Sequence, residues 1–422
     1  MSGKHSHSFI PKPSKKILLS ISLAYLILLF LRNPKLFIYP RFWAEEGSVY
    51  FQTAYNEGFF NALFQVQMGY FSIIPNLGSA LASLPPLHYA PFVTLLLSLI
   101  VQWINIALIH NNSHPFWGLS HNKLILYLIL IFLPFNEEVF LNTICSQFHL
   151  QISVFLMIYL YQGQKPSSSH ILVYALAFLS GGVGIITFAI FCIFIKRENY
   201  KKFKAVYYAF ALGFVIQAFF YCISHTPRLY SFDLKYYLQI LVSKHILGPS
   251  FGYQLEPLYY GIRTIKNFLI ESNFSALSNI VKIDYLKVLL TTSGAITLFL
   301  AVKQFYKQAS ILLPSLVLSI VFVFLSLKNG SDSFLSFHGG GRYFFASNFI
   351  LYMGIYESTI KISSLNIWFK KIILLWYIII GSYSYFQHPE ILIPKTPMQH
   401  QLHKRVIQLA PSNFVLQINP VL

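Results

Sequence analysis

The chain has 422 residues, of which 55% are hydrophobic and only 10% are charged, and its mean hydropathy is +0.58. The surface of a soluble domain needs about a quarter charged residues, so this composition excludes a soluble globular protein and predicts an integral membrane protein. The net charge of +18 is dispersed among apolar segments. That dispersion argues against a nucleic-acid partner and favours membrane lipids with anionic head groups.

Apolar runs along the chain predict an all-α, polytopic helical membrane protein with about 11 transmembrane helices. The first run follows basic residues and has no small-residue cleavage site after it, so we expect a retained span with a cytoplasmic N-terminus. The basic segment 196–204 is the strongest cytoplasmic marker. The expected crossings are 17–31, 89–109, 124–135, 151–161, 171–195, 205–223, 286–302, 311–327, 343–356 and 372–386.

These crossings define a transmembrane domain over residues 1–386, with external loops at 33–88 and 224–285 and an external C-terminal tail at 387–422. The stretch 171–195 fits either one tilted span or a hairpin broken at the Ser180-Gly181-Gly182 segment. Only the hairpin keeps residues 196–204 cytoplasmic. We therefore expect two short helices whose turn is covered by neighbouring protein rather than lipid.

Glu45 and Glu46 follow the first predicted span and are adjacent, in a chain with only 13 acidic residues. After them, Phe51, Tyr55 and Phe59 recur every four residues, which is typical of an interfacial helix. At head-group depth, partial desolvation and mutual repulsion would raise the pKa of at least one carboxyl group and make it a better general base. The alternative is a helix start, where acidic side chains are common.

Glu137 and Glu138 form a second acidic pair, at the outer end of a short predicted span. Glu138 and Asn142 are four residues apart, which places them on one face of a helix. His149 follows. These four residues are candidates for binding substrate hydroxyl groups, although a simple helix start explains the acidic pair equally well.

A third polar cluster precedes a span near the C-terminal end, in the segment 337–345. Three glycines allow close approach of backbone amides to an anion, and the Arg342 guanidinium suits a phosphate. His338, Tyr343 and Lys328 complete a candidate donor-phosphate site. Alternatively, Arg342 extends to lipid head groups. No nucleotide-binding or zinc motif occurs, so cytoplasmic nucleotide chemistry is not expected.

Four short motifs resemble those of bacterial multi-pass glycosyltransferases of the GT-C superfamily. They extend over most of the chain, up to about Tyr356, and are Phe42-Trp43-Ala44-Glu45-Glu46-Gly47, Gly69-Tyr70 with Ile74-Pro75, Asn136-Glu137-Glu138-Val139-Phe140-Leu141-Asn142, and Gly341-Arg342-Tyr343-Phe344-Phe345.

The resemblance implies a polyprenyl-phosphate-sugar donor, a glycan, lipid or protein acceptor, and an active site on the outer face of a bacterial cytoplasmic (inner) membrane. It implies that Glu45 or Glu46 accepts the acceptor's proton or binds a divalent cation such as Mg²⁺ or Mn²⁺, and that Arg342 contacts the lipid phosphate. The family's pair usually contains an aspartate; the Glu-Glu pair here makes cation binding less favourable, and no cofactor is otherwise expected.

Two competing hypotheses remain at this point. A transporter or flippase of a lipid-linked glycan would line a path with the same charged residues. A glycan polymerase or ligase with a pyrophosphate-linked donor would depend on arginines and histidines. The glycosyltransferase hypothesis makes a geometric demand: Glu45-Glu46, Glu137-Glu138 and Arg342 should face one cavity.

Overall fold

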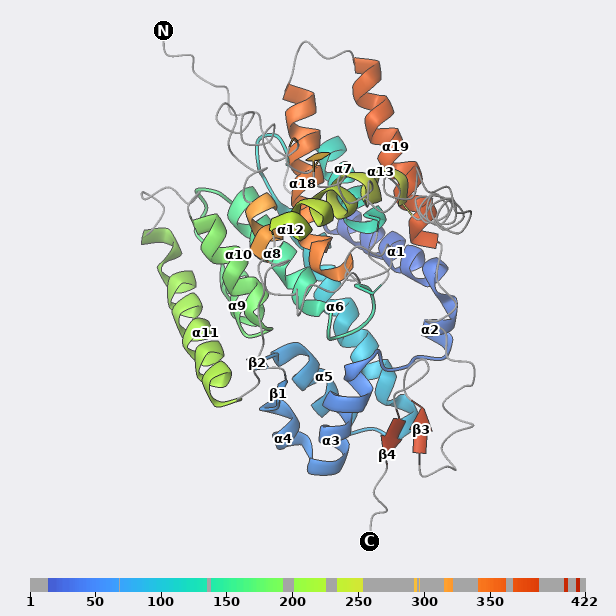
Figure 1. Ribbon diagram of the computed structural model, residues 1–422, viewed down its shortest axis with the longest axis vertical. Coiled ribbons are helices and arrows are strands. Elements are labelled where there is room, and N and C mark those ends of the chain that lie inside the picture. The colour runs from blue at the N-terminus through green and yellow to red at the C-terminus, as the bar shows by residue number, and fades with distance from the viewer. Residues whose placement is uncertain are drawn as a thin grey trace, which may run out of the picture.

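The computed structural model describes residues 14–67, 69–134, 138–192, 201–224, 234–252, 292–293, 296, 315–321, 341–361, 367–386, 406–408 and 415–417. This described part is all-α, apart from two short β-hairpins (Figure 1). Most residues of the expected spans at 286–302 and 311–327 lie outside the described residues. The number of crossings therefore stays a prediction.

The N-terminal half contains α1 (Lys15–Arg32), α2 (Pro34–Ile38), the π-helix η1 (Glu46–Phe51), α3 (Gln52–Glu57), α4 (Phe59–Leu63), β1 (Val66–Gln67), β2 (Tyr70–Phe71), α5 (Ile73–Ala82), η2 (Leu87–Tyr89), α6 (Ala90–Asn111), α7 (Ser120–Phe132), α8 (Ser146–Leu160), α9 (Ser168–Phe178) and α10 (Gly182–Cys192). The C-terminal half contains α11 (Lys204–Ile223), α12 (Leu234–Ile240), the π-helix η4 (Leu241–Leu247), α13 (Gly248–Phe251), α18 (Gly341–Lys361), α19 (Ile367–Phe386), β3 (Val406–Gln408) and β4 (Val415–Gln417).

Helix α8 is the centre of the bundle, because 13 of its 15 residues are buried. It packs against α6, α9, α10 and α18. A polar contact ties it to α6: the Asn105 side chain donates to the His149 carbonyl at 3.0 Å and accepts from the Ser153 hydroxyl at 2.8 Å. The first residue of α8 therefore has a fixed position relative to most of the described helices.

Polar contacts gather helix ends into two groups. At one end of the bundle, His110 near the end of α6 contacts the Ser14 carbonyl before α1 at 3.2 Å. At the same end, Glu357 of α18 accepts hydrogen bonds from Trp117 at 3.0 Å and from Tyr159 at 2.6 Å. These contacts place the start of α1 and the ends of α6, α8 and α18 together, as the alternating directions predicted from the sequence require.

The end of α1 and the start of α8 lie at the opposite end of the bundle. Arg32 at the end of α1 lies between two aromatic rings, 4.5 Å from the Phe140 centroid and 4.4 Å from that of Tyr385. Figure 1 shows α3, α4, α5 and both β-hairpins at its lower end. Strand β4 of the C-terminal tail lies against η1, which begins with Glu46.

Two helices of the described part, Leu87–Asn111 and Lys201–Ile223, are long and apolar enough to cross a membrane by length and composition. Shorter apolar helices pack among them: Ile73–Ala82, Ser120–Phe132, Ser146–Leu160, Ser168–Phe178 and Gly182–Cys192. Large apolar side chains are exposed on the outer faces of α1, α6, α11 and α19, among them Leu19, Leu96 and Leu212. The described bundle thus has an apolar outer surface around a partly polar interior.

The stretch 171–195 contains two helices, α9 and α10, which confirms the predicted hairpin. The chain turns at Gly181, whose φ of +77° favours glycine. The Gly181 amide donates to the Phe71 carbonyl at 2.9 Å, and Gln217 of α11 donates to the same carbonyl at 2.8 Å while accepting from the Phe71 amide at 3.0 Å. Neighbouring protein covers the turn, as predicted.

The sequence predicts interfacial helices in the first external loop, and short helices are present there, but the four-residue spacing of Phe51, Tyr55 and Phe59 does not belong to one continuous helix. The segment forms η1, α3 and α4, and the last two are separated at Gly58, where φ is +91°. The wider turns of the π-helix rotate the side chains away from the four-residue pattern. Phe51 is therefore buried against Phe42, with ring centroids 4.4 Å apart, whereas Phe60 is exposed.

We expect Gln217→Leu to destabilise the fold, because it removes three buried hydrogen bonds, two to Phe71 and one to the Phe178 carbonyl at 3.2 Å. Unsatisfied buried polar groups cost about 1–3 kcal/mol each. The free energy of unfolding in detergent micelles should fall by at least the lower value. Val215→Ala, on the exposed face of the same helix, is the control, and equal stability of both variants would contradict the assignment.

Candidate functional site

The Glu46 carboxylate joins the loop after α2 to the turn before α8. Its side chain is only 1% exposed. Oε2 accepts from the Trp43 amide at 3.0 Å, and Oε1 accepts from the Thr143 amide at 2.8 Å and from the Thr143 hydroxyl. Burial raises the pKa of the Glu46 carboxyl group, and the hydrogen bonds from Thr143 and Trp43 act against that rise. Both oxygens are thus already occupied.

Two residues next to these contacts have left-handed backbone conformations, although neither is glycine. Ala44 has φ of 45° and Leu141 has φ of 61°. Such residues cost about 1–3 kcal/mol and persist only where the surrounding structure holds them, often at functional sites. η1 itself is π-helical, a conformation that is also enriched at such sites. The meeting of the two loops is the most strained place in the described backbone.

Residues 138–145 form turns rather than a helix, so the prediction that Glu138 and Asn142 share a helical face is wrong. Asn142 holds the turn instead. Its side-chain nitrogen Nδ2 donates to the Glu138 carbonyl at 2.7 Å, and its side-chain oxygen Oδ1 accepts from the Cys145 backbone amide at 2.8 Å. The side chain is buried and serves the backbone that positions Thr143.

The three predicted clusters meet around Cys145, whose side chain is fully buried at the start of α8. Burial raises the pKa of its thiol to about 12, and the charges of Arg342, Glu138, Glu46 and Glu45 act on the same sulfur. Arg342 forms an ion pair with Glu138 at 3.6 Å. Residues separated by almost 300 positions in the sequence therefore converge on one place.

Glu45 differs from Glu46 in its surroundings. It is half-buried, and among the described residues no hydrogen bond or ion pair occupies its carboxylate. The adjacent pair therefore divides into one carboxylate fixed by three donors and one that is open.

The other predicted site residues have varied positions. His149 is buried, and its Nε2 contacts the Val139 carbonyl at 3.1 Å, so its ring also supports the turn. Tyr343 packs edge-to-face on Phe148, with centroids 5.7 Å apart, beside the Arg342 guanidinium. Glu137, His338 and Lys328 lie outside the described residues.

Sequence inspection gave no role to Thr143, Arg41 or the Trp43 side chain. Thr143 supplies two of the three donors to Glu46. The Arg41 guanidinium lies 4.8 Å from the Trp43 ring centroid. The available signal for Arg41 was a charged residue directly before Phe42 and Trp43 in the segment that contains Glu45 and Glu46.

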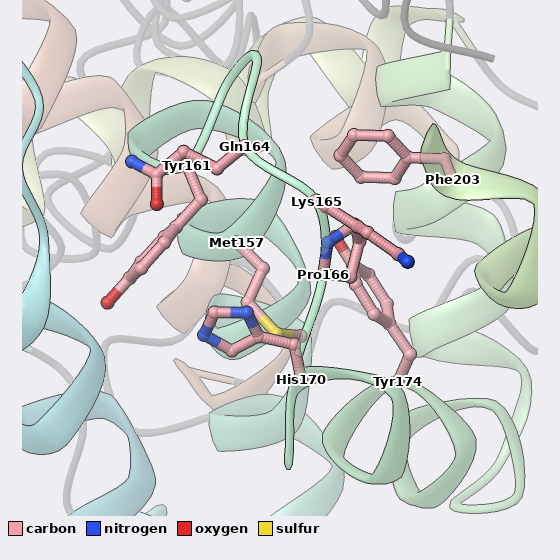
Figure 2. Close-up of a pocket in the computed structure, with 8 residues that line it drawn as sticks. All are labelled: Met157, Tyr161, Gln164, Lys165, Pro166, His170, Tyr174 and Phe203. Carbon is pink, nitrogen blue, oxygen red and sulfur yellow. The ribbon is translucent and has the colours of Figure 1, made fainter. Parts of the chain in front are cut away.

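The described residues contain no group of three or more side chains that could together hold a metal ion. Figure 2 shows a pocket at the other end of α8, about 20 Å from Cys145 by the rise of a helix. It is lined by Met157, Tyr161, Gln164, Lys165, Pro166, His170, Tyr174 and Phe203. None of these is a predicted site residue.

Comparisons with protein-family models, with curated proteins and with solved structures found no match to this chain. The functional argument consequently rests on the residues and their geometry.

We expect Thr143→Val to lower the free energy of unfolding by about 1.5–3 kcal/mol, the usual contribution of a hydrogen bond to a charged group. Valine preserves the shape that packs against Gly78 but removes the hydroxyl donor to Glu46. Thr143→Ser is the matched control, because it keeps the hydroxyl. Measured by denaturation in micelles, the free energy of unfolding of the serine variant should exceed that of the valine variant. The reverse order would show that packing, and not the hydrogen bond to Glu46, determines stability at this position.

Proposed function

We propose that the chain is a polytopic inverting glycosyltransferase, which transfers a sugar from a polyprenyl phosphate to an acceptor at the outer face of a bacterial cytoplasmic membrane. The convergence of Glu45, Glu46, Glu138 and Arg342 around Cys145 carries this proposal. The resemblance of the motifs to the GT-C superfamily supplies the reaction class. Membrane embedding is supported by the apolar outer surfaces of α1, α6, α11 and α19.

The open carboxylate of Glu45 is the proposed general base. It takes the proton of the acceptor hydroxyl, and the acceptor oxygen attacks the anomeric carbon from the face opposite the phosphate. The bond from that carbon to the phosphate oxygen breaks, and its electron pair leaves with the polyprenyl phosphate. Such base catalysis typically contributes about 10²–10⁴ in rate.

Glu46 is the proposed positioning residue. Because both of its oxygens accept hydrogen bonds from Trp43 and Thr143, it is poorly placed to accept a proton from a substrate. Its bonds instead fix Glu45, the next residue, relative to the start of α8. If a divalent cation takes part, the pair offers only two carboxylates, and solvent or substrate oxygens complete its shell.

The transporter hypothesis is less well supported. A transport path places charged side chains along the depth of the membrane. The described Glu45, Glu46 and Glu138 lie together at one end, and Glu357 at the other end is bonded to Trp117 and Tyr159. The arrangement fits a localised reaction site better than a path.

We expect Glu45→Gln to lower the transfer rate by about 10²-fold or more while leaving the fold intact, because the side chain loses its basic oxygen and breaks no hydrogen bond in the described structure. The assay presents purified protein with a panel of polyprenyl-phosphate hexoses and pentoses and measures release of polyprenyl phosphate.

Glu45→Asp is the matched control, since it keeps the carboxylate on a shorter stem and should retain partial activity. Glu46→Gln should lower both the rate and the free energy of unfolding. Full activity of a folded Glu45→Gln variant would disprove the base assignment. Failure of the wild-type protein to release polyprenyl phosphate from any donor of the panel would count against the proposed function.

A further inference from the structure

Arg41 is a buried cation without a hydrogen-bond partner. Its Nε and Nη1 atoms are inaccessible to solvent and form no hydrogen bond. Burial lowers the pKa of Arg41 to about 10, so the guanidinium stays charged at neutral pH. A buried charge with unsatisfied donors is costly unless it is compensated. These buried donors therefore create a demand for a negatively charged hydrogen-bond acceptor.

No neighbouring carboxylate meets that demand. Glu46 attracts the Arg41 guanidinium, but its two oxygens already accept from Trp43 and Thr143. Between the described residues Arg41 and Glu46 the structure shows no ion pair. The guanidinium lies over the Trp43 ring, a contact that supplies no formal negative charge.

Two further donors in the same segment are also unused. The Trp43 indole nitrogen and the Ser48 hydroxyl are buried and form no hydrogen bond. A guanidinium, an indole N–H and a hydroxyl within eight residues of chain are groups that donate to oxygen anions, and none of them except the hydroxyl can accept a hydrogen bond. The segment 41–48 thus combines one open carboxylate, Glu45, with several unsatisfied donors.

Arg342, the arginine that the sequence favoured for phosphate binding, is in the opposite situation. Its charge is balanced by Glu138 at 3.6 Å, and it lies beside the Tyr343 ring. An anion would have to compete with Glu138 for Arg342, whereas it would meet no competing acceptor at Nε and Nη1 of Arg41. Arg41 is therefore the arginine of the two whose hydrogen-bond donors are available to an anion.

We propose that Arg41, assisted by the Trp43 indole and the Ser48 hydroxyl, binds the phosphate group of a polyprenyl-phosphate lipid, and that Arg342 does not. This inference rests on the proposed function, because the sugar donor of that reaction supplies the phosphate. A guanidinium presents parallel N–H groups that match two phosphate oxygens. Arg41 is half-buried as a whole, so part of the residue is accessible to a phosphate group.

The placement also serves the reaction. The leaving phosphate gains negative charge as the bond to the anomeric carbon breaks, and a cation adjacent to it stabilises that charge in surroundings of low polarity. Arg41 lies four residues before Glu45. The base and the phosphate ligand would then come from one loop, whose shape is fixed by Glu46.

The test measures binding of farnesyl phosphate, a short polyprenyl monophosphate, to the purified full-length chain in detergent by calorimetry. Arg41→Met should weaken this binding by about tenfold or more, the loss expected when hydrogen bonds to a charged group are removed. Arg41→Lys should lose less, because it keeps the charge without the fork of donors. Arg342→Met, the matched control, should bind within threefold of wild type.

A second measurement separates binding from folding. Without ligand, Arg41→Met should unfold at a temperature close to that of wild type, because removal of an unbonded buried charge offsets the loss of its attraction to Glu46. Farnesyl phosphate should raise the unfolding temperature of wild type but not of Arg41→Met. A variant that is strongly destabilised without ligand would show that Arg41 supports the fold, and would overturn the proposal.

Two further probes define the ligand. Farnesol, which lacks the phosphate, should bind at least tenfold more weakly than farnesyl phosphate, and so should inorganic phosphate, which lacks the chain. Equal affinity for inorganic phosphate would overturn the assignment to a lipid. Binding of farnesyl phosphate to Arg41→Met within twofold of wild type would overturn the role of Arg41.

These outcomes differ from failure of the proposed function. Glu45→Gln should bind farnesyl phosphate as wild type does and transfer sugar about 10²-fold or more slowly. If wild type transfers sugar and Arg41→Met keeps its affinity, only the phosphate assignment fails. If wild type transfers none but its binding depends on Arg41, the lipid-phosphate site stands and the reaction is wrong.

Discussion

The geometry of this site depends on the buried carboxylate of Glu46. Residues 46 and 143 are 97 positions apart, and the Thr143 amide and hydroxyl both donate to the same Glu46 oxygen. An ionised carboxylate is expensive to bury unless its oxygens accept several hydrogen bonds, and three donors meet that condition here. The interaction therefore stabilises one register between the first loop and the start of α8, and it holds Ala44 and Leu141 in conformations that they would otherwise leave.

The charges near Cys145 form two unlike sets. Glu138 and Arg342 balance each other at 3.6 Å and need no ligand. Glu45 and Arg41, in the loop that Glu46 fixes, form no hydrogen bond or ion pair among the described residues. A site that must bind an anion and abstract a proton needs such unpaired groups in its ligand-free state, because a group already paired must first lose that pairing.

Much of the arrangement of helices could be predicted from the sequence, because apolar periodicity and basic loops depend on neighbouring residues. The hairpin broken at Gly181 follows from the need to keep residues 196–204 on one side, and the structure confirms it. The charges of Glu45, Glu46, Glu138 and Arg342, which were expected on a common side, all act on Cys145. The single cavity that they were expected to face stays a prediction, and Glu137 lies outside the described residues. The details within the loops could not be predicted. Three of these details are the π-helical turn of η1, the left-handed conformation of Ala44 and the hydrogen bond from the Asn142 side chain to its own turn. They depend on contacts between segments that are distant in sequence, so no local sequence pattern predicts them.

The same distinction governs how substitutions in the site can be interpreted. Glu46, Thr143 and Asn142 are bonded to the backbone of the two loops, so a change in any of them alters stability and activity together. Glu45 and Arg41 break no hydrogen bond when they are replaced, and removing an unpaired buried charge can even favour the folded state. Loss of function at these two positions therefore reports chemistry rather than folding. In the proposed site, the reacting side chains form no hydrogen bonds and are held in place by neighbouring residues that do. The strained backbone and the buried carboxylate belong to those neighbours, so the reacting side chains stay available to substrate.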